Sequence, residues 1–431
     1  MKYYSLNNVS PNVDFREATI HGQAPDKGLY FPESIPILPA GLLNDIDTLS
    51  REEVAFRIIQ PYVGGTIPDA DLQRIVGETV DFEFPLVPIS PSISALELFH
   101  GPTLAFKDVG ARFMSRCLGY FVRGSDRPVT VLVATSGDTG GAVANGFYNI
   151  DGVRVVILYP SGKVSSVQEL QLTTLGKNIT ALEVAGTFDD CQQLVKQAFA
   201  DTILRQHLFL TSANSINVAR WLPQQFYYFF AWQQWPDRQN PPVISVPSGN
   251  FGNICAGLLA HRSGLPVRHF IAACNANDVI PQYLQTGDYR PVSATATMSN
   301  AMDVGDPSNF VRILELFGGQ LPRLKDTLSA VSISDEETIS AIRELYTNDH
   351  YLPDPHGAVG WLALHRYLSA HPGEKGFLLE TAHPVKFYDT VEPIIRETIP
   401  LPASVRSLLN KRKQSICIEP VYAKLKDFLL K

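Results

Sequence analysis

The chain has 431 residues, of which 45% are hydrophobic and 18% are charged, as in an ordinary globular protein rather than a disordered one. Its formal net charge of −7 gives no electrostatic reason to expect a nucleic-acid partner, and no apolar run approaches membrane-spanning length. The sequence begins without a secretory-signal pattern, and its five cysteines form no CxxC pair. We therefore expect a cytoplasmic protein without structural disulfides or a metal site, in which each cysteine is a small buried residue.

The first part of the chain mixes short apolar runs with proline and glycine, and it predicts a small helix-rich N-terminal domain, residues 1–90. A proline-rich passage, FPLVPISPSIS, then predicts an extended connection into the main body of the protein. The next element is a helix, because the apolar residues of KDVGARFMSRCLGYFV recur at helical spacing.

From residue 129 onward, apolar strands alternate with helices, one of which spans FDDCQQLVKQAFADTIL. The predicted strands are VTVLVA, VRVVILY, NITALEVA, the start of LFLTSANS, VISVP, HFIAAC and GFLLETA. Near-continuous apolar strands are typical of a parallel sheet covered on both faces. The sequence thus predicts two doubly wound α/β lobes with a cleft between them, a large domain over residues 91–125 and 225–431 and a small domain over residues 126–224. In such sheets, ligands bind at the carboxyl ends of the strands.

Lys107 stands at the start of the first of these helices, in the sequence HGPTLAFKD. A lysine at the buried end of a helix loses hydration, which lowers its pKa and makes the amine available as a nucleophile or base. A lone lysine more often packs its stem and extends its charged head into water. The reactive alternative therefore depends on the loops that follow. Each of them comes directly after an apolar strand, unlike the turn before Lys107.

The turn in VPSGNFGN lies between a strand and the helix NICAGLLAH. Its glycines let backbone N–H groups approach an anion closely, and the helix N-terminus adds its positive dipole. Several N–H groups must converge to hold a phosphate, because each exposed helix-end contact contributes only about 0.3–1 kcal/mol. Taken alone, the segment fits a plain tight turn equally well.

Three further loops carry polar side chains. ATSGDTGG could bind a carboxylate with hydroxyls and backbone donors, and the Asn/Ser cluster of SANSINVARW could form an anion site or a helix cap. Thr381 could cap a helix or hydrogen-bond a ring nitrogen. GxGxxG, Walker A, GxSxG and HExxH patterns are absent, which disfavours dehydrogenases, NTPases, serine hydrolases and zinc proteases. A reactive amine, a phosphate cup, a carboxylate site and a neutral hydroxyl are together what pyridoxal phosphate chemistry needs.

The sequence resembles the threonine synthases through a series of motifs: GLYFP, HGPTLAFKD, TSGDTG, LYPSGK, SANSIN, VPSGNFGN, NAMDVGDPSN, DPHGAVG and TAHPVKF. The resemblance spans nearly the whole chain and is to the branch shared by many bacteria and fungi. It implies the fold type II architecture of pyridoxal-phosphate enzymes with a small N-terminal unit. It also implies a lyase that converts O-phospho-L-homoserine and water to L-threonine and phosphate by γ-elimination and β-addition of water, the last step of threonine biosynthesis. A phospho-lyase that releases 2-oxobutyrate from the same substrate is the alternative. A non-catalytic protein on this scaffold is disfavoured, because it would not need the lysine.

The resemblance further implies roles for single residues. Lys107 would form the Schiff base with pyridoxal 5′-phosphate and move the α proton of the substrate, and Thr381 would face the pyridine nitrogen. Asp138 would lie beside the ring hydroxyl, where related enzymes often have asparagine, and this leaves its protonation state open. The cofactor phosphate would be bound by Gly249, Asn250, Phe251, Gly252 and Asn253. The substrate would be bound through its carboxylate by Ser136 and Thr139, and through its phosphate by Lys163, Asn214, Ser215 and Arg220. We expect a small-molecule substrate, no nucleic-acid or membrane partner, and a monomer or homodimer.

Overall fold

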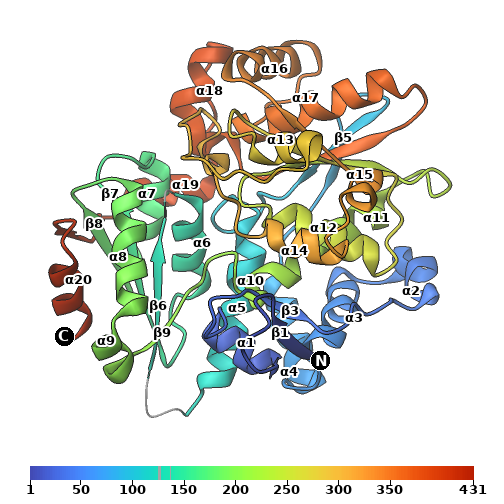
Figure 1. Ribbon diagram of the computed structural model, residues 1–431. Helices are drawn as coiled ribbons and strands as arrows, with labels where there is room; N and C mark the ends of the chain where they lie inside the picture. The colour runs from blue at the N-terminus through green and yellow to red at the C-terminus, as the bar shows by residue number, and fades with distance from the viewer. Residues whose placement is uncertain (125–127, 136) are drawn as a thin grey trace. The chain divides into compact units, whose positions relative to one another are not determined.

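The computed structural model describes residues 1–124, 128–135 and 137–431 (Figure 1). The chain forms two compact units. Unit one contains Met1, Phe31–Phe106 and Trp221–Pro400, and unit two contains Lys2–Tyr30, Lys107–Arg220 and Leu401–Lys431. The predicted domain bounds (1–90, 91–125 with 225–431, and 126–224) group the residues differently and stay a prediction, because a compact unit need not coincide with a domain.

Among its described residues, unit one contains a six-stranded sheet in the order β12-β11-β10-β13-β5-β4. All neighbours in it are parallel except β4 and β5. Every residue of the central strands β10 and β13 is buried, which confirms the prediction of a sheet covered on both faces. The strands are β4 (Leu86–Pro88), β5 (Ile93–Glu97), β10 (Val243–Pro247), β11 (His269–Cys274), β12 (Leu328–Ser332) and β13 (Gly376–Glu380).

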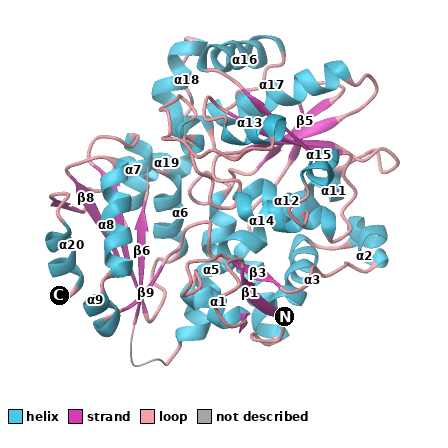
Figure 2. Ribbon diagram, viewed as in Figure 1, coloured by secondary structure: helices cyan, strands magenta, loops and turns pink. Residues whose placement is uncertain are grey.

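Helices pack on this sheet, as Figure 2 shows, with α17 against β10, β11 and β13. α11 is buried all round over QFYYFFAW, so the aromatic residues of this segment are part of the core. The helices of unit one are α2 (Ala40–Asp45), α3 (Arg51–Val63), α4 (Asp69–Thr79), α11 (Gln225–Gln234), α12 (Gly252–Arg262), α13 (Val279–Thr286), α14 (Phe310–Leu316), α15 (Leu321–Thr327), α16 (Asp335–Asn348), α17 (Pro355–Ala370) and α18 (Tyr388–Ile395).

Unit two contains, over its described residues, a parallel sheet in the order β14-β8-β7-β6-β9. Its strands are β6 (Val129–Ala134), β7 (Val153–Pro160), β8 (Ile179–Val184), β9 (Phe209–Thr211) and β14 (Ser415–Ile418). Its helices are α1 (Phe15–His21), α5 (Lys107–Val122), α6 (Asp138–Gly146), α7 (Ser166–Thr173), α8 (Phe188–Ala200), α9 (Thr202–His207), α19 (Ala403–Leu409) and α20 (Tyr422–Leu429), and α10 (Val218–Trp221) begins in it. Near the N-terminus, β1 (Lys2–Ser5) pairs antiparallel with β2 (Val13–Asp14), and β3 (Tyr30–Pro32) carries the chain into unit one.

Three expectations about single elements are wrong. The predicted helix FDDCQQLVKQAFADTIL is broken at Asp201, which is extended and whose carboxylate caps α9. The proline-rich passage is more than a connection, because it forms β4 and the start of β5. All five cysteines are free, but Cys417 is exposed rather than buried. In the part of the chain that the structure describes, no helix is both long and apolar enough to cross a membrane.

Candidate active site

In each unit, the loops predicted to carry chemistry leave neighbouring parallel strands at one edge of the sheet. In unit one, β10, β13 and β5 are adjacent, and they lead into the Gly249 loop, Thr381 and the turn before Lys107. That turn therefore does follow a strand, contrary to the expectation from sequence. In unit two, β7, β6 and β9 are adjacent and lead into the loops of Lys163, Asp138 and Asn214. The carboxyl edge of each sheet thus gathers its candidate residues, as doubly wound folds predict.

The Gly249 loop ends at a helix start that no side chain caps. Phe251 is the N-cap of α12, and its backbone lies in the left-handed region with φ 59° and ψ 13°. A non-glycine residue in this region costs free energy that the surrounding structure must offset, which is a feature of functional loops. Because the phenylalanine side chain cannot accept a hydrogen bond, the first N–H groups of α12 remain suited to an anion.

Gly249 makes room for another segment of backbone. A Cβ at Gly249 would lie 2.6 Å from Met302 Cα and 3.0 Å from Ala301 O, distances that a real side chain does not reach. The sequence indicated a glycine that lets the loop approach an anion. The structure shows in addition that this glycine lets the loop pack directly against residues 301 and 302.

The two asparagines of this loop have different environments. The Asn250 side-chain oxygen accepts a hydrogen bond from Ser308 N at 2.7 Å, and its backbone oxygen accepts one from Asn309 Nδ2 at 3.1 Å. Asn253 is buried, and its Oδ1 accepts a hydrogen bond from the Tyr228 hydroxyl at 2.9 Å. Among the described residues, Asn253 Nδ2 has no hydrogen-bond partner. A buried donor in this state costs about 1–3 kcal/mol, so the site fits a ligand with oxygen acceptors.

The turn before Lys107 pairs with the segment that follows β13. Phe106 N donates to Thr381 O at 2.8 Å, and His383 N donates to Leu104 O at 3.1 Å. Leu104 has a positive φ of 58°, so this turn also contains a strained residue. Lys107 follows Phe106 directly and is the first residue of α5, as the apolar spacing predicts.

Thr381 is buried and does not cap the following helix. The N-cap of the short helix η4 (Pro384–Phe387) is His383, whose Nδ1 accepts from Val385 N at 3.1 Å. The cap alternative for Thr381 is therefore wrong, and its contact with a ring nitrogen stays a prediction. Burial, with a smaller contribution from the neighbouring His100, lowers the pKa of His383 to about 4, so this imidazole is neutral near pH 7.

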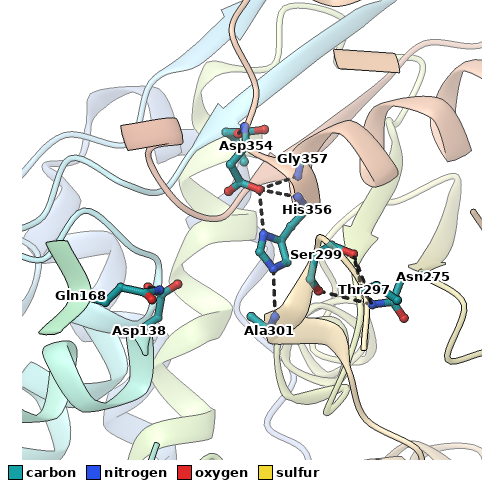
Figure 3. Close-up of polar contacts among 10 residues, drawn as sticks. Asp138, Gln168, Asn275, Thr297, Ser299, Ala301, Asp354, His356 and Gly357 are labelled. Atoms are coloured by element: carbon teal, nitrogen blue, oxygen red, sulfur yellow. Dashed lines mark hydrogen bonds and ion pairs between the residues drawn. The ribbon is translucent and has the colours of Figure 1, made fainter. Parts of the chain in front are cut away.

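In unit two, Asp138 is buried at the start of α6 and is held by Gln168. Gln168 Nε2 donates to Asp138 Oδ1 at 2.9 Å (Figure 3). The Thr135 hydroxyl accepts from Gly137 N at 3.0 Å and from Gly140 N at 2.8 Å, so it stabilises the start of α6 rather than pointing at a ligand. Sequence reasoning missed Gln168, although its capping box with Ser165 marks the start of α7.

The remaining candidates of unit two differ in exposure. Arg220 is buried, and its Nη1 donates to the carbonyl of Ala213, which directly precedes the half-buried Asn214 and Ser215 in the same loop. Lys163 lies in the exposed turn after β7. Of the two residues predicted to bind the substrate carboxylate, Thr139 is half-buried, and Ser136 lies outside the described residues.

Comparison with known proteins identifies the family. The family model for pyridoxal-phosphate dependent enzymes matches residues 92–379, and models for the threonine synthase N terminus and C-terminal part match residues 2–80 and 357–429. The threonine synthase of Serratia marcescens is 44% identical over 100% of this chain and 99% of its own length. The chain belongs to the threonine synthase family. The threonine synthase of Escherichia coli (strain K12) is 45% identical over 93% of both chains.

Solved threonine synthases share this fold over their full length. The crystal structure from Escherichia coli has a TM-score of 0.92 and 43% identity, covering 100% of this chain and 99% of that one. The PLP-bound threonine synthase from Brucella melitensis has a TM-score of 0.94 at 35% identity with the same coverage. A maize serine racemase shows the fold alone, with a TM-score of 0.53 at 17% identity over 77% of this chain. The predicted fold type II architecture and pyridoxal-phosphate dependence are therefore confirmed.

Proposed function

We propose that this chain converts O-phospho-L-homoserine and water to L-threonine and phosphate. The full-length match to threonine synthases, at both ends of the chain as well as in the cofactor-binding part, is the observation that carries this proposal. The protein would act in the cytoplasm on this small molecule as a monomer or homodimer, without a nucleic-acid or membrane partner.

Unit one would hold the phosphate of the cofactor. The N–H groups of Gly249, Asn250, Phe251 and Gly252 and the side chain of Asn253 are its proposed donors, supported by the uncapped start of α12 and by the buried Asn253 Nδ2. The Thr381 hydroxyl would hydrogen-bond the pyridine nitrogen. A neutral hydroxyl cannot protonate that nitrogen as a carboxyl group would, so the ring nitrogen would stay uncharged.

Lys107 would bind the cofactor covalently through its amine and then move protons. When bound, pyridoxal phosphate supplies an electron sink for negative charge at the substrate Cα. The Lys107 amine would remove the α proton of the substrate and return protons later in the reaction. General acid–base catalysis by one positioned group contributes about 10²–10⁴-fold in rate.

Asp138 would contact the ring hydroxyl of the cofactor. Gln168 Nε2 can only donate a hydrogen bond, so Asp138 Oδ1 is an acceptor and does not carry the proton of this contact. The carboxylate of the substrate would be bound by Ser136 and Thr139, and its phosphate by Lys163, Asn214, Ser215 and Arg220. The hydrogen bond from Arg220 Nη1 to the Ala213 carbonyl supports this assignment, because Ala213 directly precedes Asn214 in the same loop.

An end-point assay tests the proposal. The purified, cofactor-loaded protein is incubated with O-phospho-L-homoserine, and threonine, 2-oxobutyrate and phosphate are quantified together. We expect threonine equal to phosphate. Phosphate matched by 2-oxobutyrate would instead establish the alternative, a phospho-lyase on the same scaffold. If neither threonine nor 2-oxobutyrate forms although the cofactor is bound, the proposed substrate is wrong.

A further inference from the structure

We propose that His356 is a positioning residue for the cofactor phosphate loop, because it fixes the backbone of residues 301 and 302 on which Gly249 packs (Figure 3). His356 belongs to the motif DPHGAVG and Ala301 to NAMDVGDPSN, two motifs without a role in the proposed chemistry. The inference rests on the proposed function, since it assumes that the Gly249 loop binds the phosphate. All the residues in its argument belong to unit one.

Asp354 determines which nitrogen of His356 carries a proton. Asp354 is the N-cap of α17, and its Oδ1 accepts from Gly357 N at 3.1 Å and from His356 Nδ1 at 2.9 Å. Both side chains are buried, with 0% of Asp354 and 2% of His356 exposed. Because Nδ1 donates to the carboxylate, Nε2 of the neutral ring is an acceptor. It accepts from Ala301 N at 3.2 Å.

The contact with Ala301 reaches the phosphate loop in one further step. Ala301 and Met302 lie in the short helix η3 (Asn300–Met302), and Met302 Cα is in close contact with Gly249. A shift of η3 would therefore displace Gly249 or open a gap beside it. The backbone direction of Gly249 sets where the following N–H groups point, so the geometry of the phosphate site depends on η3.

The other side of the loop is held by the end of the same motif. Ser308 N and Asn309 Nδ2 donate to Asn250, and Arg312 Nη1 donates to Asn309 Oδ1 at 2.7 Å. The segment from residue 300 to residue 309 thus contacts the loop at both ends. His356 ties the first end to α17, a helix packed on the central strands of the sheet.

Two substitutions separate this role from simple anchoring of α17. His356→Gln keeps an acceptor at the reach of Nε2 but does not reproduce the donor to Asp354. His356→Asn keeps a donor at the reach of Nδ1 but is too short to accept from Ala301 N. If His356 positions the loop, glutamine preserves cofactor binding and asparagine does not. If His356 only anchors the start of α17, the order is reversed.

The measurement is the dissociation constant of the apo-protein for pyridoxal phosphate and for pyridoxal, which lacks the phosphate. We expect His356→Asn to weaken pyridoxal phosphate binding about 5- to 150-fold, the effect of one lost buried hydrogen bond, and to leave pyridoxal binding within about twofold. His356→Gln should stay within about threefold of wild type for both. The ³¹P resonance of bound cofactor should move in the asparagine variant only. His365→Ala, an exposed histidine on the same helix, is the matched control and should change nothing.

Three results would overturn the inference. The two His356 variants could weaken pyridoxal phosphate binding equally, or the glutamine variant could weaken it more than the asparagine variant. The asparagine variant could also lose as much affinity for pyridoxal as for pyridoxal phosphate. If the asparagine variant does not fold, Gly249→Ala tests the same contact from the loop side, because its Cβ would push against Met302. It should weaken pyridoxal phosphate binding and not pyridoxal binding, and equal binding of both would overturn the inference. Failure of the proposed site itself looks different, because then Asn253→Ala would bind pyridoxal phosphate as tightly as wild type.

Discussion

The candidate residues of the two units differ in how firmly the surrounding structure holds them. In unit one, the phosphate loop is held by backbone packing at Gly249, by hydrogen bonds from Ser308 and Asn309 to Asn250 and by the Tyr228 hydroxyl at Asn253. In unit two, Asn214, Ser215 and Thr139 are half-buried loop or helix-start residues, and Lys163 is exposed. A rigid site loses little conformational entropy when a ligand binds, whereas half-buried residues can adjust to the ligand. We infer that unit one supplies a preformed site for the phosphate of the cofactor, whereas unit two supplies Lys107, Asp138 and the residues that bind the substrate.

We expect the largest effect for Lys107→Ala, because Lys107 is the proposed cofactor-binding and proton-transferring residue. It directly follows the turn paired with Thr381. We expect turnover to fall by at least about 10³-fold and the visible absorption band of lysine-bound cofactor to disappear. If unit one alone holds the phosphate, the variant should still bind pyridoxal phosphate, which ³¹P NMR would detect. Lys386→Ala is the comparison, since Lys386 is buried, whereas Lys107 is half-buried, and Lys386 donates to Thr103 O at 2.7 Å. Retained turnover in Lys107→Ala without added amine would refute the assignment.

Arg220→Ala tests unit two. We expect KM for O-phospho-L-homoserine to rise about 10- to 100-fold, because a hydrogen-bonded charge pair contributes about 1.5–3 kcal/mol, while the dissociation constant for pyridoxal phosphate stays unchanged. Steady-state kinetics and a cofactor titration on one preparation measure both. Arg205→Ala, in the last turn of α9, is the control. Loss of cofactor with unchanged KM would place Arg220 at the other anion site and break the division of labour between the units.

A smaller effect is expected for Gln168→Ala, which removes the amide that holds Asp138. The cavity and the lost hydrogen bond make the position of Asp138 less fixed, and we expect kcat to fall about 3- to 10-fold. The absorption maximum of the bound cofactor should shift, because the partner of its ring hydroxyl changes. Gln168→Glu sharpens the test, because two carboxylates within hydrogen-bond reach must share a proton and the shift should then depend on pH. An unchanged spectrum in both variants would mean that Asp138 does not contact the ring.

The sequence predicted seven parallel strands, which are apolar runs, and α5 begins at Lys107 as its periodicity requires. It missed β12 and β14, and it missed β4 and β5 because prolines beside a strand suggest an extended connection as strongly as a sheet. The sequence did not show which residues are hydrogen-bond partners. Gln168 lies 30 residues from Asp138, and His356 lies 55 residues from Ala301, so only the folded chain shows these contacts. Thr135 shows the converse, because its hydroxyl fits a ligand site by type but is used inside α6.

The smallest expected effect concerns stability and tests how rigid unit one is behind its site. Glu380 directly precedes Thr381 and is fully buried, and its Oε1 accepts from Asp354 N at 2.7 Å. Burial raises the pKa of Glu380 well above its ordinary value, and the negative charge of Asp354 raises it further. The folded protein therefore favours the protonated form. The stability that this proton contributes is complete below the unfolded pKa, about 4.3, and is lost as the pH rises through the folded-state pKa.

Glu380→Gln keeps the oxygen that accepts from Asp354 and stays neutral at every pH. Its melting temperature should match that of wild type at about pH 4 and exceed it by about 2–4 °C at about pH 8, with the difference growing as the pH rises. Thermal unfolding of the apo-proteins across this range measures it, and Glu344→Gln, which replaces an exposed carboxylate on α16, controls for the change in net charge. A difference that shrinks with rising pH would show that the buried carboxyl is ionised. Glu380, which directly precedes Thr381, and Asp354 would then both be negatively charged. Thr381 would be held less rigidly than the phosphate loop.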